Sequence, residues 1–101
     1  MDITVEELKA KLDSKEKFVF IDVREQYEYD EFNLGARLLP LGDLPYKLTE
    51  ISDDTEAEII VYCRSGARSG MAKSLLTNAG FSNVRNLMGG VLDWQEKFGK
   101  G

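Results

Sequence analysis

The segment from residue 59 to residue 79 constrains the fold of this chain more than any other. It opens with Ile59–Tyr62, a short apolar and β-branched run that is typical of a buried strand. Gly66 follows, where the backbone must curl tightly. Apolar residues then recur at helical spacing, at positions 71, 72, 75, 76 and 79. A strand, a tight loop and a helix in this order predict an open α/β sheet.

Cys63, the only cysteine, lies between the predicted strand and the predicted helix. In an open α/β sheet the ligand site lies at the carboxyl ends of the strands, where a helix N-terminus favours an anion. We therefore expect this helix end, together with Arg64 and Arg68, to lower the pKa of the Cys63 thiol. The alternative is that Cys63 is a small buried core residue. The two neighbouring arginines favour a reactive thiol instead.

The absence of histidine restricts the chemistry of this thiol. With no imidazole, a Cys–His pair cannot form within the chain. With one cysteine, neither an intrachain disulfide nor an internal resolving thiol is possible. The usual His and Cys ligand sets for a metal are also missing, so we expect no metal site. The loop N–H groups and the arginines must then supply the thiolate.

Length, charge and composition restrict the number of domains and the kinds of partner that this protein can have. A chain of 101 residues is long enough for one domain. The net charge of −5 argues against nucleic acid as a partner, because phosphate binding needs a basic face. The sequence has no secretory signal and no apolar stretch of membrane-spanning length. We expect a cytoplasmic protein that does not bind a membrane.

Helical and strand patterns alternate along the rest of the chain, which indicates a parallel sheet. Thr4 and Glu7 have the spacing of a capping box at the start of the first helix. Asp22 ends a strand at the same predicted sheet edge as Cys63. The predicted helices cover residues 4–13, 24–31, a short turn within 42–51, the segment that ends at 79, and the segment after 90; the predicted strands cover 18–23, a short stretch within 34–41, 59–62 and 83–87.

Three stretches in this order resemble the signatures of a single-domain rhodanese, the sulfurtransferase fold. IDVRE at residues 21–25, followed by Glu28 and Tyr29, is similar to the first signature of that family. CRSGAR at residues 63–68 is similar to its active-site loop, and GGVLDW at residues 89–94 to its C-terminal signature. The resemblance extends over nearly the whole chain, which is identified as a single rhodanese domain spanning residues 1–101.

The resemblance implies an α/β fold with a five-stranded parallel sheet flanked by helices on both faces. It also implies a sulfurtransferase. Cys63 would take a sulfane sulfur from a small anionic donor such as thiosulfate, become a persulfide, and pass the sulfur to cyanide or a thiol. Because the sequence has no second cysteine, the acceptor would be external: a small thiol or a thioredoxin-like protein. No cofactor is required.

The resemblance also assigns roles to the residues around Cys63. The loop would surround the transferred sulfur with its amides, and the two arginines would hold the anionic donor; the substrate-binding residues are Arg64, Ser65, Gly66, Ala67 and Arg68. Asp22 and Arg24 would support the loop from the neighbouring strand end. One departure lies in the first signature, where EFNL at residues 31–34 precedes Gly35 one residue short and without the usual histidine.

Two other functions are compatible with a Cys–Arg loop. A cysteine phosphatase or arsenate reductase also holds a tetrahedral oxyanion at such a loop, but a phosphatase needs five residues between its cysteine and its arginine. Here that position is Ser69, and the arginine comes one residue earlier. A shorter loop suits a single sulfur better than a phosphoryl group. A non-catalytic interaction module is the other alternative, although such a module has no need of the cysteine.

Overall fold

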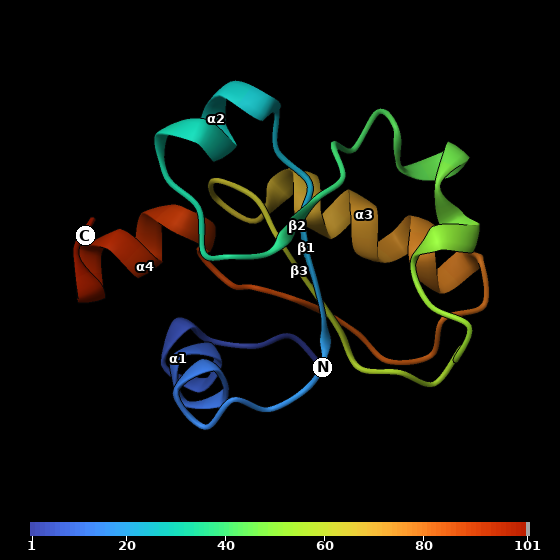
Figure 1. The fold of residues 1–101 in the computed structure, drawn as a ribbon, viewed down its shortest axis with the longest axis horizontal. Helices are drawn as coiled ribbons and strands as arrows, with labels where there is room; N and C mark the ends of the chain where they lie inside the picture. The colour runs from blue at the N-terminus through green and yellow to red at the C-terminus, as the bar shows by residue number, and fades with distance from the viewer. Residues whose placement is uncertain (101) are drawn as a thin grey trace.

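The computed structural model describes residues 1–100, and its architecture is a parallel sheet between helices (Figure 1). All strand pairs are parallel, in the order β2-β1-β3-β4. The strands are β1 (Val19–Asp22), β2 (Arg37–Leu38), β3 (Ile59–Tyr62) and β4 (Val84–Asn86). The helices are α1 (Val5–Asp13), α2 (Gln26–Glu31), α3 (Ala67–Asn78) and α4 (Gly90–Phe98), with two 3₁₀ turns, η1 (Leu44–Tyr46) and η2 (Leu48–Glu50). Within residues 1–100, no helix has the length and apolar character needed to cross a membrane.

The expected five-stranded sheet was wrong, because the part of the chain that the structure describes has four strands in its sheet. At the β4 edge the N-terminal segment forms only an isolated parallel bridge, between Ile3 and Leu87. Thr4 is already the N-cap of α1, and its hydroxyl and the Glu7 carboxylate form the predicted capping box. The backbone therefore turns into a helix before a second residue can pair with β4.

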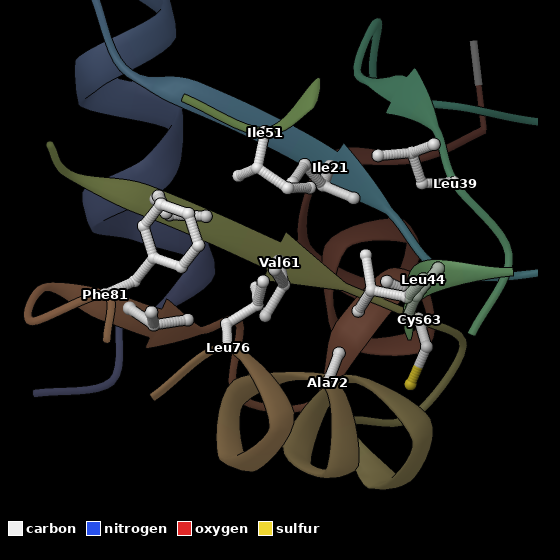
Figure 2. Packing of buried hydrophobic residues seen from close by; sticks show 12 residues of the cluster. Ile21, Leu39, Leu44, Ile51, Val61, Cys63, Ala72, Leu76 and Phe81 are labelled. Carbon is white, nitrogen blue, oxygen red and sulfur yellow. The ribbon is translucent and has the colours of Figure 1, made fainter. Parts of the chain in front are cut away.

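The buried strand β3 divides the core into two layers. Alternate side chains of a strand point to opposite faces, so Val61 and Cys63 lie on one side while Ile60 and Tyr62 lie on the other. The first layer includes Ala72 and Leu76 of α3, Leu44 of η1, and Ile51, which follows η2 (Figure 2). The second layer packs against α1 and α4, with Leu8 and Val91 buried. Helices therefore cover both faces of the sheet.

The shortened turn of the first signature is closed by side chains of its own neighbourhood. The Asn33 carboxamide oxygen accepts a hydrogen bond from the Gly35 N–H at 2.9 Å, and its NH₂ donates to the Tyr29 carbonyl oxygen at 3.1 Å. Gly35 has φ +87°, which glycine adopts without strain. The Tyr29 hydroxyl donates to the Ala36 carbonyl oxygen at 2.7 Å. Asn33 thus closes a turn in which no histidine is present.

The first turn of α4 lies directly against the backbone at the end of β3. The N–H groups of Val91 and Leu92 donate to the carbonyl oxygens of Cys63 and Arg64, both at 3.0 Å. Gly90 has φ +57°, and a Cβ atom at this position would lie 2.5 Å from each of the two carbonyl oxygens. Only glycine allows α4 to approach this closely, and the contact holds the Cys63 backbone in place.

We expect Gly90→Ala to lower the free energy of unfolding by about 2–4 kcal/mol, because the added Cβ requires a left-handed backbone and displaces α4 from the two carbonyl oxygens. Urea denaturation followed by circular dichroism measures this loss. Gly42→Ala is the matched control, since a Cβ at Gly42 meets nothing within 4 Å. An equal loss of stability in both variants would contradict the close approach of α4.

Candidate active site

Cys63 follows β3 directly, and its side chain is buried, with 1% of its surface exposed. Figure 2 shows its sulfur directed toward the N-terminal end of α3. Gly66 is the N-cap of α3 and has φ +107°, a backbone conformation that side chains other than glycine rarely adopt. No side chain caps this helix end. The first N–H groups of α3 are therefore available to the Cys63 sulfur.

Hydrogen bonds from the loop stabilise the negative form of the thiol. The Gly66 N–H donates to Cys63 Sγ at 3.1 Å, and the Ser69 hydroxyl lies 3.3 Å from the same sulfur. Burial raises the pKa of Cys63, but hydrogen bonds from the Ser69 hydroxyl and from the N–H groups of Ser69, Gly66 and Ser65 outweigh it. The pKa of Cys63 therefore lies below its ordinary value, as expected for a nucleophilic thiol.

The two arginines of the loop have different surroundings. The Arg68 guanidinium forms a bidentate ion pair with Glu28 of α2, with N···O distances of 2.7 and 2.8 Å. The Glu28 carboxylate raises the pKa of Arg68, and the negative charge of Cys63 adds to this effect. Arg64 is exposed, and no ion pair within residues 1–100 includes it. Hydrogen bonds, rather than these arginines, are the leading causes of the lowered pKa of Cys63.

Asp22 and Arg24 form a buried ion pair at the end of β1, at an N···O distance of 2.7 Å. The Arg24 guanidinium also donates to the carbonyl oxygen of Phe32, the C-cap residue that follows α2, at 2.6 Å. Burial lowers the pKa of Arg24, but the hydrogen bond and charge of Asp22 raise it above its ordinary value. Beyond the pair itself, the Arg24 side chain is therefore bonded to the end of α2, the helix that carries Glu28, and among the described residues it has no hydrogen bond to the Cys63 loop.

Sequence reasoning missed three residues that lie at the site. Ser69 stands one position beyond the predicted loop and is fully buried. The side-chain oxygen of Asn86, at the end of β4, lies 2.5 Å from the Ser69 hydroxyl oxygen, so the one hydroxyl proton is shared between Asn86 and Cys63 Sγ. The Asn86 NH₂ donates to the Gly66 carbonyl oxygen at 3.1 Å. The third is Glu28, which the first signature includes but to which we assigned no role. The sheet-edge rule could have identified Asn86, because parallel strands end at the same edge.

The arrangement brings together Cys63 and the backbone N–H donors of Ser65, Gly66 and Ser69, while the side chains of Ser65 and Ala67 are exposed. It can hold a thiolate without a general base. Within the described residues, no group of three or more His, Cys, Asp or Glu side chains could hold a metal ion. The chemistry that fits these donors is nucleophilic attack by a thiolate on a small partner.

Comparisons with known proteins place this geometry in a family. The family model of the rhodanese-like domain matches residues 4–97. A sulfurtransferase of Allochromatium vinosum is 34% identical over 94 residues, which are 92% of this chain and 86% of that protein. YrkF of Bacillus subtilis, a candidate sulfur carrier protein, is 37% identical over 97 residues, but the chain spans only about half (51%) of its length.

Solved structures show the same fold. The human single-domain sulfurtransferase TSTD1 superposes with a TM-score of 0.84 at 26% identity, covering 95% of this chain and 96% of that one. The rhodanese-like domain of the Anabaena protein Alr3790 has a TM-score of 0.84 at 30% identity, covering 98% of this chain and 76% of that one. The family model and these likenesses cover the four parallel strands, the helices on both faces and the loop of Cys63. The chain therefore belongs to the rhodanese-like domain family.

Proposed function

We propose that this protein is a sulfurtransferase in which Cys63 carries the transferred sulfur. The observation that supports this most directly is the sulfur of Cys63 within hydrogen-bond distance of the Gly66 N–H and the Ser69 hydroxyl. These donors stabilise a negative charge on the inner sulfur without an imidazole. Family membership and the sulfurtransferase of Allochromatium vinosum favour the same activity.

The reaction has two steps, with thiosulfate as the donor. The Cys63 thiolate attacks the outer sulfur of thiosulfate, the sulfur–sulfur bond of the donor breaks, and its electron pair leaves with sulfite. The product on the enzyme is a persulfide anion, so the total charge is unchanged. An external thiolate or cyanide then attacks the outer sulfur of the persulfide and regenerates the Cys63 thiolate. No electrons are gained or lost overall, and no cofactor takes part.

In this proposal, different residues of the loop bind different parts of the sulfur donor. In the proposed complex, the amides of Ser65, Gly66 and Ala67 contact the transferred sulfur. The exposed Arg64 binds the anionic end of the donor, and Arg68 contributes to this binding while it stays paired with Glu28. Asp22 and Arg24 support the loop indirectly. Arg24 holds the end of α2, and α2 carries Glu28, which pairs with Arg68 of the loop.

Discharge of the persulfide requires a partner outside the chain. Cys63 is the only cysteine in the sequence, and the structure leaves it as a free thiol. We propose a small thiol or a thioredoxin-like protein as the acceptor. A lone reduced thiol of this kind also suits a reducing compartment, which in our proposal is the cytoplasm.

Intact-mass spectrometry after incubation with thiosulfate tests the proposal directly. We expect the protein to gain one sulfur atom, and dithiothreitol to remove it, because the persulfide forms on the one cysteine. Cys63→Ser should lose the mass gain and all thiosulfate:cyanide sulfur transfer while retaining its circular dichroism spectrum. Sulfur transfer at the wild-type rate by the serine variant would exclude the mechanism.

The pH dependence of alkylation tests the stabilisation of the thiolate. The pKa of Cys63 is lowered, so its reaction with iodoacetamide should reach half its maximal rate at a pH below that of an ordinary thiol. Ser69→Ala removes one donor to Sγ and should move this midpoint to higher pH. Ser74→Ala is the matched control, since Ser74 is an exposed serine of the same helix. An unchanged midpoint in Ser69→Ala would contradict a role for the hydroxyl.

A further inference from the structure

Only one of the three arginines around the Cys63 loop carries a charge that no acid within residues 1–100 balances. Arg24 is buried against Asp22, and Arg68 is paired with Glu28. Arg64 alone is exposed and enters none of the ion pairs of the described residues. Of the two arginines that the sequence places in this loop, one therefore has its charge balanced by an acid from another part of the chain.

Glu28 is held in a position where it stays ionised. Its side chain is 11% exposed and binds both terminal nitrogens of Arg68. The same carboxylate accepts a hydrogen bond from the Glu25 N–H at 3.1 Å, at the start of α2. The hydrogen bonds from Arg68 lead among the causes that lower the pKa of Glu28 to about 2. The carboxylate therefore remains charged at every pH at which the protein would work.

Both ends of α2 are fixed, so Glu28 cannot easily move away from Arg68. The first turn is closed by the carboxylate of Glu28 itself on the Glu25 N–H. The last turn is held by the hydrogen bond from the buried Arg24 to the Phe32 carbonyl oxygen. A donor that approaches Cys63 consequently meets Arg68 as half of a neutral pair.

This arrangement affects donors of different charge differently. When a thiolate attacks thiosulfate, a singly charged anion approaches a doubly charged one. A cation whose charge no acid balances lowers the repulsion between these two anions. A persulfide of a small thiol carries at most one negative charge on its sulfane end. Its attack by Cys63 depends far less on a free arginine, because the repulsion is smaller or absent.

We propose that Glu28 is a specificity-determining residue, which by pairing with Arg68 makes the Cys63 site favour persulfides of small thiols over doubly charged donors such as thiosulfate. The proposal rests on the proposed sulfurtransferase function. In the favoured reaction, the Cys63 thiolate attacks the terminal sulfur of R–S–SH. The sulfur–sulfur bond of the donor breaks, R–S⁻ leaves with its electron pair, and the proton stays on the terminal sulfur, which is now bound to Cys63.

Glu28→Gln tests this role, because glutamine keeps an oxygen acceptor for Arg68 and for the Glu25 N–H but removes the charge. Rates of sulfur loading onto Cys63 are measured with thiosulfate and with cysteine persulfide as donors. We expect kcat/KM for thiosulfate to rise about tenfold, mainly through a lower KM, and that for cysteine persulfide to change by less than about twofold. High ionic strength should reduce the gain with thiosulfate, which a merely structural role would not produce.

Glu58→Gln is the matched control, because it makes the same change of charge in a partly buried ion pair. Glu58 pairs with Arg85 and Lys11 immediately before β3, at the end of the strand opposite Cys63. It should leave the ratio of the two kcat/KM values unchanged. An unchanged ratio in Glu28→Gln, or an equal shift in both variants, would overturn the role of Glu28.

The same measurements test the sulfurtransferase function and the role of Glu28 separately. If wild-type Cys63 gains sulfur from neither donor, the sulfurtransferase function fails, and the role of Glu28 in that function fails with it. If wild-type Cys63 gains sulfur from either donor and Glu28→Gln does not alter the preference between them, the sulfurtransferase function stands and only the role of Glu28 is refuted.

Discussion

The turn between β3 and α3 is the constraint on which the candidate site depends. Gly66 ends this turn in a left-handed conformation and thereby directs its N–H to Cys63 Sγ. On the other side of the turn, the first N–H groups of α4 bind the carbonyl oxygens of Cys63 and Arg64. The N-terminal ends of α3 and α4 thus provide hydrogen-bond partners for the thiol and for the carbonyl oxygens next to it. These hydrogen bonds keep the loop at the sheet edge ordered.

Ion pairing decides the electrostatic character of the site as much as the loop does. A buried or half-buried guanidinium is unfavourable unless an acid balances it. Asp22 does this for Arg24, and Glu28 does it for Arg68. The thiolate is consequently stabilised mainly by hydrogen-bond donors at short range, while acids of the first half of the chain balance the charges of Arg24 and Arg68. In the proposed reaction, stabilisation of the nucleophile and attraction of the donor are thus two separate properties of the site.

Local sequence patterns predicted most of the elements. The strand Ile59–Tyr62 and the Thr4–Glu7 capping box are confirmed, and the other predicted elements differ from the structure mainly in their ends. The segment 42–51, predicted to hold a short helix or helical turn, forms two 3₁₀ turns. The fifth strand was wrong because pairing with β4 competes with the capping of α1, and the capping box begins the helix at once. The roles of Cys63 and its loop stay predictions that the sulfur-loading experiments address.

The sequence by itself determined the strand–loop–helix unit, the place of the single thiol within it and the absence of an imidazole base, because each depends on residues a few positions apart. Only the tertiary structure decided which side chains reach that thiol. Ser69 meets Asn86 across 17 positions, and Arg68 meets Glu28 across 40. Such contacts follow from strand order and from the packing of α2 beside the loop. No short pattern encodes them, because they exist only once the sheet has brought its strand ends to one edge.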